Sequence, residues 1–244
     1  MPLRTIDFIE TADDIRPERV QGKVAAAADV LRATSTIVTA LQNGCREVIP
    51  ALTVEDALAI YSSFPSDEVV LGGERGGKRI PGFHLGNSPR EYVPEVVFAK
   101  RVITTTTNGT RALVNSSAAK EVVVLSFLNL QAVVERLAGA AGDLCLIAAG
   151  NDGRASIEDS VCCGETIRRL MLSRPDAFRL TPDAEKAVTI SEQWSGSTVQ
   201  LLENCPHGKF LQKIGFGSDL AFCAQLDQFA VAPLFKAGRV RILL

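Results

Sequence analysis

The sequence is poor in the residues that build zinc sites. Its 244 residues include six cysteines but only two histidines, and no C-x-x-C motif occurs. Zinc centres in proteins are mostly built from closely spaced cysteine and histidine ligands. A zinc centre is therefore not expected, and the cysteines are expected to be free thiols, buried or scattered.

Long apolar runs and dense basic runs are also missing. No apolar stretch reaches the length that crosses a bilayer, and the N-terminal residues have no continuous apolar core of the signal-peptide type. Lysine and arginine are spread along a chain of net charge −2, which gives no support for a nucleic-acid or membrane surface. We therefore expect a cytoplasmic protein without nucleic-acid or membrane partners.

Common catalytic motifs are absent as well. The chain has no Walker motif, no H-E-x-x-H, no G-x-S-x-G and no repeat of fixed period. Residues 213–217, KIGFG, lack the third glycine of a dinucleotide-binding fingerprint. Cys162 and Cys163 each precede an arginine at the spacing of the C-x₅-R phosphatase loop, but both lie in a helical pattern. A reactive, low-pKa thiol is not expected there, so a thiol nucleophile is disfavoured.

The patterns that are present predict an α/β protein. Strand and helix patterns alternate from residue 23 onward, which predicts a largely parallel or mixed sheet with crossover helices. The length suits one large domain over residues 1–244, or two intimately packed halves of about 1–125 and 126–244. The expected strands are 5–9 (at an edge of the sheet), 23–28, 46–51, 68–71, 101–106, 121–125, 143–149 and 239–244.

The turn after strand 23–28 is the first candidate site. Asp29 follows the strand directly, and Arg32 lies before the next helix. That helix opens with three hydroxyl residues: Thr34, Ser35 and Thr36. A carboxylate at the carboxyl end of a strand, an arginine and helix N–H groups together predict a site for a cation and an anion. An equally good interpretation is that Asp29 only ends a strand and Thr34 only caps a helix.

Residues 72–94 are rich in glycine and proline and show no periodicity. A long irregular insert in a compact domain is usually functional, so we expect a binding loop. Glu74 and Arg75 lie where an open α/β sheet presents ligand-facing side chains. His84, in the same loop, is a candidate general acid, although a lone loop histidine more often only forms hydrogen bonds. His207 has no comparable setting.

Two later strands end in similar turns. The first turn carries hydroxyl, amide and guanidinium groups that suit an oxyanion: Thr107, Asn108, Gly109, Thr110 and Arg111. A plain Asn-Gly turn after a β-branched strand is the alternative. The second turn contains Asn151, Asp152 and Arg154. Glu158 and Asp159 open the helix that follows, where they either stabilise the helix dipole or hold a metal facing Asp152.

The carboxyl ends of parallel strands meet at one edge of a sheet, so these turns are expected to converge. Their carboxylates suit Mg²⁺ and their arginines suit a substrate with several anionic groups, which predicts Mg²⁺-assisted chemistry on a small polyanion. The expected catalytic and metal-binding residues are Asp29, Glu74 and Asp152, with Glu74 either a third ligand or a general base. The expected substrate-binding residues are Arg32, Ser35, Thr36, Arg75, Asn108, Gly109, Thr110, Arg111 and Asn151. Attack by water is the working mechanism. A covalent intermediate on Asp29 stays open, although the D-x-D spacing is absent because Leu31 follows at the second position.

Five ordered segments resemble one family of enzymes. The segments are DVLRATSTIVTAL, GGERGG with PGFHLGNSPREY, ITTTTNGTRAL, AAGNDGRASIEDSVCCG and DLAFCAQLDQFAVAP, spread over about residues 23–233. Together they resemble the 2-phosphosulfolactate phosphatase (ComB-like) family. The resemblance implies a three-layer α/β fold and Mg²⁺-dependent hydrolysis of 2-phosphosulfolactate to sulfolactate and phosphate. It also implies a place in coenzyme M biosynthesis or in sulfolactate metabolism.

Two other functions stay open at this point. One is a non-catalytic binding module for a small anion, and the other is a phosphatase for a different phosphorylated 2-hydroxy acid. A homodimer is the default expectation for the oligomeric state.

Overall fold

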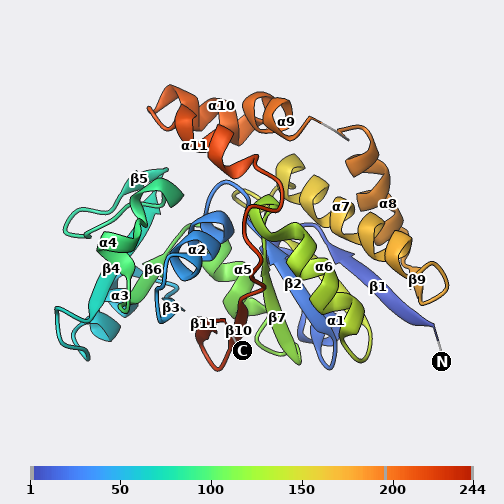
Figure 1. Cartoon of the computed structure of the whole chain (residues 1–244), viewed down its shortest axis with the longest axis horizontal. Coiled ribbons are helices and arrows are strands. Elements are labelled where there is room, and N and C mark those ends of the chain that lie inside the picture. Colours follow the sequence, from blue (N-terminus) through green and yellow to red (C-terminus); the bar gives the residue numbers. More distant parts are fainter. Residues whose placement is uncertain (1–2, 195–196, 243–244) are drawn as a thin grey trace.

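Figure 1 shows the computed structural model, which describes residues 3–194 and 197–242. Within these residues, eleven strands form one mixed sheet with helices on both faces, which confirms the predicted three-layer α/β fold. The strands are β1 (Arg4–Ile9), β2 (Val24–Ala28), β3 (Glu47–Pro50), β4 (Val69–Arg75), β5 (Lys78–Arg79), β6 (Arg101–Thr105), β7 (Glu121–Leu125), β8 (Leu144–Ala148), β9 (Phe178–Leu180), β10 (Leu234–Lys236) and β11 (Arg239–Arg241). The α-helices are α1 (Pro17–Val20), α2 (Ala33–Gln42), α3 (Val54–Tyr61), α4 (Pro94–Val97), α5 (Gly109–Asn115), α6 (Leu130–Gly139), α7 (Ile157–Ser173), α8 (Pro182–Glu192), α9 (Thr198–Asn204), α10 (Pro206–Lys213) and α11 (Gly217–Cys223). Short 3₁₀ helices are η1 (Ala12–Asp14), η2 (Pro89–Glu91) and η3 (Phe127–Asn129).

The sheet consists of two blocks of parallel strands with an antiparallel hairpin between them. The strand order is β5-β4-β6-β3-β11-β10-β7-β2-β8-β1-β9. The first block is β4, β6 and β3, and the second is β7, β2, β8, β1 and β9. Strands β10 and β11 pair antiparallel with each other and with their outer neighbours. The blocks do not follow a division at residue 125, because β1 and β2 belong to the second block; the two sequence halves stay a prediction.

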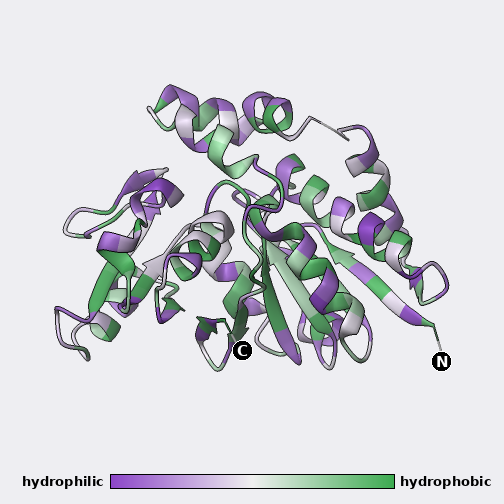
Figure 2. Cartoon of the chain, in the orientation of Figure 1, coloured by the Kyte–Doolittle hydropathy of each residue, from purple (hydrophilic) through white to green (hydrophobic). Residues whose placement is uncertain are grey.

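Strand β2 shows how the sheet is buried on both faces. Val24, Ala26 and Ala28 pack into one hydrophobic core, and Ala25 and Ala27 pack into the other. Side chains from helices α6, α7 and α8 contribute to the first core, and side chains from α1, α2, α4 and α5 contribute to the second. Successive strand side chains point to opposite faces, so a strand covered on both sides needs an unbroken apolar run. In Figure 2 the inner strands are mostly green, whereas purple residues gather on outer helix faces and loops.

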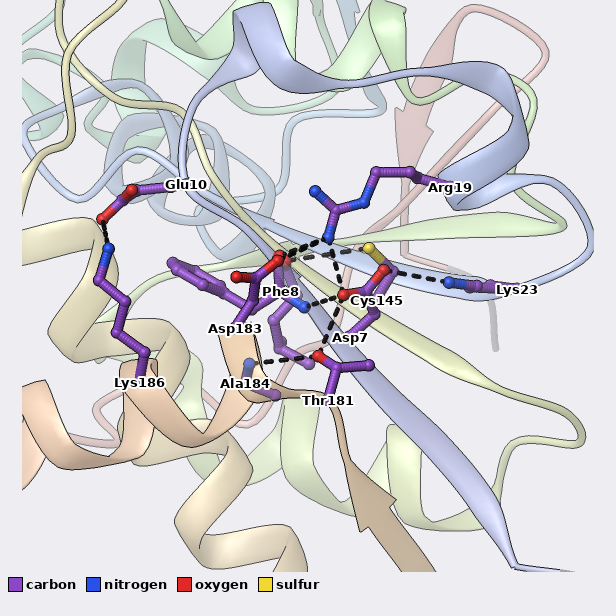
Figure 3. Close-up of polar contacts among 11 residues, drawn as sticks. Asp7, Phe8, Glu10, Arg19, Lys23, Cys145, Thr181, Asp183, Ala184 and Lys186 are labelled. Atoms are coloured by element: carbon purple, nitrogen blue, oxygen red, sulfur yellow. Dashed lines mark hydrogen bonds and ion pairs between the residues drawn. The ribbon is translucent and has the colours of Figure 1, made fainter.

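Strand β1 is an inner strand, and a buried carboxylate connects it to its surroundings. The expected edge strand at 5–9 pairs with β8 on one side and with the short β9 on the other, so the edge prediction is wrong. Asp7 Oδ1 accepts hydrogen bonds from Arg19 of α1 at 2.8 Å and from the hydroxyl of Thr181, just before α8, at 3.2 Å (Figure 3). Its Oδ2 pairs with Lys23 at 3.2 Å. This network ties the second block to the helices beside it.

Strand β4 is longer than the sequence predicts. It continues through Gly72 and Gly73, where the glycine-rich loop was expected to begin. A Cβ on Gly73 would lie 2.2 Å from the Thr105 carbonyl oxygen, and one on Gly72 would lie 2.0 Å from the Tyr92 hydroxyl. Gly73 therefore allows close packing on the neighbouring strand β6, and Gly72 allows close packing of the Tyr92 side chain on β4. The strand expected at 239–244 is β11, and its residues 243–244 lie outside the described part of the chain.

Helices α9, α10 and α11 lie together at the top of Figure 1, with α10 and α11 above α2 and α9 nearer to the second block. Their leucines Leu201, Leu211 and Leu220 join the first core, which fixes the three helices to the body of the protein. No helix in residues 3–194 or 197–242 has the length and apolar character needed to span a membrane.

Candidate active site

A cavity of about 310 Å³ lies where strand ends from both blocks meet. Its walls come from the segments after β2, β4, β6 and β8, and from the start of α10. The lining residues are Asp29, Leu31, Arg32, Glu74, Gly76, Gly77, Asn87, Thr107, Asn108, Asn151, Asp152, Pro206, His207 and Phe210. Six predicted site residues are among them: Asp29, Arg32, Glu74, Asn108, Asn151 and Asp152. The expected convergence therefore exists, although two parallel blocks produce it and not one parallel sheet.

Asp29 is a buried carboxylate, with 7% of its surface exposed. The turn around it is held by Thr34, whose hydroxyl donates to the Asp29 carbonyl at 2.9 Å, and by Ala33, whose amide donates to Asp29 Oδ1 at 3.2 Å. Burial, together with the nearby carboxylates of Glu74 and Glu158, raises the pKa of Asp29 to about 7, because a charged carboxylate loses its hydration in such a site. Asp29 therefore exchanges a proton near neutral pH.

Glu74 connects the turns after β4 and β6. Its Oε1 accepts hydrogen bonds from the amide and the hydroxyl of Thr107, at 2.8 and 2.9 Å, and its Oε2 accepts one from the Gly77 amide at 2.8 Å. These bonds occupy most of the accepting capacity of the carboxylate. Glu74 thus holds two segments of the cavity wall in place, and its role as a metal ligand or a general base stays a prediction.

Asn108 connects the turns after β6 and β8. Its Nδ2 donates to Asn151 Oδ1 at 3.3 Å, and its Oδ1 accepts from the Asp152 amide at 3.3 Å. Asp152 is exposed, in the left-handed backbone region with φ of 49°. Gly109, the residue after Asn108, packs on Asp29: a Cβ on Gly109 would lie 2.6 Å from Asp29 Oδ2. Glycine is required at this position because helix α5 approaches the carboxylate so closely.

Arg32 is the buried cation of the cavity, with 2% of its surface exposed. Its Nη1 pairs with Asp219 Oδ2 of α11 at 2.7 Å, and its Nη2 donates to the Gly77 carbonyl at 2.7 Å. The guanidinium carbon lies 4.3 Å from the centre of the Phe216 ring. Asp219 Oδ1 also accepts from the Ser88 hydroxyl at 2.7 Å. Arg32 therefore joins the cavity floor to the C-terminal helices as well as facing the cavity.

Three predicted hydroxyl ligands make backbone contacts away from the cavity lining. Ser35 Oγ donates to the Val30 carbonyl at 2.8 Å, and Thr110 Oγ1 donates to the Thr106 carbonyl at 2.9 Å. Thr36 Oγ1 likewise donates to the Asn87 carbonyl at 2.9 Å. Buried hydroxyls need acceptors, and backbone carbonyls supply them: those of the preceding turn for Ser35 and Thr110, and one of a distant loop for Thr36. We therefore assign no substrate contact to these three residues.

Two predicted anion-binding arginines also lie outside the cavity lining. Arg75 donates to the Glu74 carbonyl at 2.7 Å and to the Thr105 hydroxyl at 3.0 Å. Arg111 forms an ion pair with Asp13, and both side chains are more than two-fifths exposed. The structure thus brings one of the three predicted arginines to the cavity, because the other two have partners of their own nearby.

A smaller space beside the cavity is lined by Glu158 and Asp159, the acidic pair for which the sequence left open either a metal-binding role or stabilisation of the helix dipole. Asp159 accepts hydrogen bonds from the amides of Val30, at 2.8 Å, and Gly150, at 3.3 Å, so it joins the ends of β2 and β8. Glu158 and His207 line the same space. Burial, and then the neighbouring carboxylates, raise the pKa of Asp159 well above its usual value. The available signal was the acidic pair at the start of α7.

Neither the loop histidine nor the cysteines lie in the cavity lining. His84 Nδ1 accepts a hydrogen bond from the Leu71 amide at 3.0 Å, so this histidine has the plain structural role considered above. All six cysteines are buried free thiols. Burial raises the pKa of Cys162 and Cys163 far above the usual thiol range, which agrees with disfavouring a thiol nucleophile.

The donor set of the cavity fits a hard divalent cation held by few protein ligands. In the part of the chain that the structure describes, no three His, Cys, Asp or Glu side chains are grouped so as to hold a metal ion together. Mg²⁺, however, is often bound through one or two carboxylates, with water and substrate oxygens completing its shell. Asp29 and Asp152 offer carboxylates of that kind.

The architecture and the cavity define an α/β protein with an acidic small-molecule site at its strand ends. Residues 9–238 match the family model of 2-phosphosulpholactate phosphatase. The chain belongs to this family of phosphatases, which are phosphoric monoester hydrolases. A relative in Clostridium acetobutylicum, named probable 2-phosphosulfolactate phosphatase, is 39% identical over 96% of this chain and 99% of its own. Relatives of the same name in Symbiobacterium thermophilum and Clostridium kluyveri are 39% and 37% identical, over 93% and 97% of this chain and 97% of their own length.

Proposed function

We propose that this chain is a Mg²⁺-dependent phosphatase that hydrolyses 2-phosphosulfolactate to 3-sulfolactate and phosphate. The observation that carries the proposal is the family match over residues 9–238. The cavity supports it, since about 310 Å³ is the lower end of the range of ligand pockets and suits a small substrate.

The negative charges that line the cavity support the proposal that a cation binds there. Asp29, Glu74 and Asp152 line it together with one arginine, Arg32. A substrate with phosphate, sulfonate and carboxylate groups would meet a surplus of negative charge there. Mg²⁺ held by Asp29 and Asp152 would neutralise part of that charge and polarise the phosphoryl group.

The residues of the chain would then bind and orient the substrate. Arg32 has N–H groups beyond the two that contact Asp219 and Gly77, and it faces the cavity from a fixed position. The amide side chains of Asn108 and Asn151 add neutral donors at the strand ends. Attack by water on phosphorus is the mechanism we favour, with a covalent intermediate on Asp29 as the alternative.

The test is phosphate release from 2-phosphosulfolactate by the purified protein, with Mg²⁺ and with EDTA, beside the Asp29→Asn variant. Turnover that requires both the metal and Asp29 supports the proposal. A rate of phosphate release that EDTA does not change contradicts the role of the metal. Tight binding of the substrate without turnover would favour the non-catalytic anion module.

A second substrate separates this function from hydrolysis of another phosphorylated 2-hydroxy acid. 2-Phospholactate lacks the sulfonate but keeps the phosphate and the carboxylate. If a buried charge in the cavity binds the sulfonate, kcat/KM for 2-phospholactate should be lower than for 2-phosphosulfolactate by about 10-fold or more, because that charge would be left unpaired. Equal turnover of the two esters would contradict specificity for the sulfonate.

We further propose that the reaction serves coenzyme M biosynthesis or sulfolactate metabolism, and that the protein acts in the cytoplasm as a homodimer without nucleic-acid partners. Six free thiols support a reducing compartment. Analytical ultracentrifugation of the purified chain tests the dimer.

A further inference from the structure

His207 does not follow a strand, so the pattern of polar residues at strand ends does not indicate it. It is the second residue of α10, and it lines both the main cavity and the acidic space beside it. It therefore borders the space that holds Arg32 as well as the space that holds Glu158, and Asp29 lines both. The chain's only other histidine, His84, is outside the cavity lining.

The sequence around His207 fixes its position. Pro206 begins the helix, and Cys205 Sγ accepts a hydrogen bond from the Gly208 amide at 3.2 Å. A Cβ on Gly208 would lie 1.7 Å from the Leu202 carbonyl oxygen, so glycine lets α10 pack closely against α9. The Phe210 ring lies 5.7 Å from the imidazole, centre to centre, and restricts its orientation. A side chain held in this way is suited to a defined contact.

Glu158 gives His207 an anionic neighbour. With 3% of its surface exposed, this carboxylate is as buried as the hydrogen-bonded Asp159. Among the described residues, however, it has no ion pair and no hydrogen bond from a nitrogen or oxygen donor, and the Cys205 thiol lies beside it. A buried carboxylate that lines the same space as an imidazole stabilises the imidazolium form and so opposes the effect of burial on His207.

The leaving group of the proposed reaction needs a proton. Hydrolysis of a phosphorylated 2-hydroxy acid releases an alkoxide, which is a poor leaving group unless it is protonated as the bond breaks. Of the side chains lining the main cavity, arginine keeps its proton and the amides and hydroxyls are too weakly acidic. His207 and a protonated carboxyl are the remaining donors.

We propose that His207 is the general acid that protonates the leaving oxygen, an inference that rests on the proposed phosphatase function. As water forms its bond to phosphorus, the bond between phosphorus and the 2-oxygen of the substrate breaks. The electron pair stays on that oxygen, which takes the proton of the His207 imidazolium, while the attacking water loses a proton to a cavity carboxylate. Both groups then exchange protons with solvent, and the products are the hydroxy acid and hydrogen phosphate.

Binding of the substrate would bring His207 into the required form. In the free protein, burial lowers the pKa of His207, and Arg32 lowers it too, against the opposing effects of Glu158, Glu74 and Asp152. A substrate with several negative charges adds to the opposing effects. Protonation of His207 is thus coupled to occupancy of the cavity.

The test compares two leaving groups in the same substrate skeleton. The first substrate is 2-phosphosulfolactate, and the second is its analogue with sulfur at the bridging position, which departs as a thiolate and needs no proton. His207→Gln should lower kcat on the oxygen ester by about 10²- to 10⁴-fold while KM changes little. On the sulfur analogue the same variant should stay within about 5-fold of the wild type, since general-acid assistance is not needed there. His84→Gln is the matched control and should change neither rate.

Each other result has a definite meaning. Equal losses on both substrates, or no loss on either, would overturn the assignment of His207 as the general acid. As a second measurement, added imidazole should restore part of the oxygen-ester activity of His207→Ala, and no restoration counts against the proposal. Absence of phosphate release by the wild-type protein from the oxygen ester would instead overturn the proposed function itself.

Discussion

Replacement of Asp29 by asparagine is expected to stabilise the metal-free protein at alkaline pH and to abolish its activity. The side chain keeps its size and its carbonyl oxygen, which can still accept the hydrogen bond from the Ala33 amide. What the replacement removes is a negative charge that is buried beside Glu74 and Glu158. The unfolded chain hydrates that charge freely, so the wild-type fold is destabilised whenever Asp29 must ionise.

The size and sign of the effect follow from the pKa of Asp29. Folding raises this pKa from 3.8 to about 7, a shift of about three units, or about 4 kcal/mol. Between these values the folded protein holds a proton that the unfolded chain has released, so the stability of the wild type falls as pH rises. The cost is absent below the unfolded pKa and complete above the folded one. Relative to the wild type, Asp29→Asn should therefore gain about 2–3 kcal/mol on going from pH 5 to pH 8.

The assay is thermal unfolding of both proteins in EDTA at pH 5, 6.5 and 8. For a domain of this size each kcal/mol moves Tm by roughly 2–4 °C, so the difference should be several degrees at pH 8 and much smaller at pH 5. Asp219→Asn is the matched control, because that buried carboxylate pairs with Arg32 at 2.7 Å. Its loss leaves a buried guanidinium without its partner and should cost about 3–5 kcal/mol.

Two results would refute this reasoning. One is an Asp29→Asn protein that is no more stable than the wild type at pH 8. The other is a stability difference that does not change with pH. Either result would mean that Asp29 does not carry a buried charge at neutral pH, and the acidic character of the cavity would need another explanation.

Three further predictions concern the metal, the close packing and the arginines. If Asp29 is a ligand, Mg²⁺ should raise the Tm of the wild type and leave the Tm of Asp29→Asn unchanged, as measured by calorimetry at increasing Mg²⁺ concentrations. Equal Tm shifts in the two proteins would contradict this. Gly109→Ala should impair activity and cost about 1–3 kcal/mol in denaturant unfolding, because its Cβ would lie 2.6 Å from Asp29 Oδ2, whereas Gly139→Ala, with nothing within 4 Å, should be neutral or slightly stabilising. Arg75→Gln and Arg111→Gln should leave the KM for 2-phosphosulfolactate within about 3-fold, since neither residue lines the cavity and exposed ion pairs contribute little; a large rise in KM for either variant would show that it contacts the substrate.

The parts of the site at strand ends could be predicted from the sequence. Asp29 directly follows β2, Glu74 lies at the end of β4, and Asn108 and Asp152 lie in the turns after β6 and β8. All four line the cavity. The underlying rule is geometric: carboxyl ends of neighbouring parallel strands lie together. The rule holds within each block of this sheet, and packing of the blocks then brings the two groups together.

The contribution of the C-terminal helices could not be predicted in the same way. His207 and Phe210 lie on helix α10, which begins at Pro206. The place of this helix over the sheet depends on long-range packing, which the local sequence does not show. Hydroxyl residues show a related difficulty. Ser35 and Thr36 have the composition of an anion site, but the nearest acceptors in the fold are backbone carbonyls, and only the tertiary structure determines that competition.

The position of β10 and β11 has a consequence for how the protein is made. These two strands follow all the others in the sequence, but they lie in the middle of the sheet, between β3 and β7. During synthesis, the two parallel blocks emerge from the ribosome before the hairpin that connects them. Until the hairpin arrives, β3 and β7 each present an unpaired backbone edge on which a foreign strand can add. A nascent or truncated chain is thus most prone to aggregation at the centre of its future sheet, where the finished protein has no edge at all.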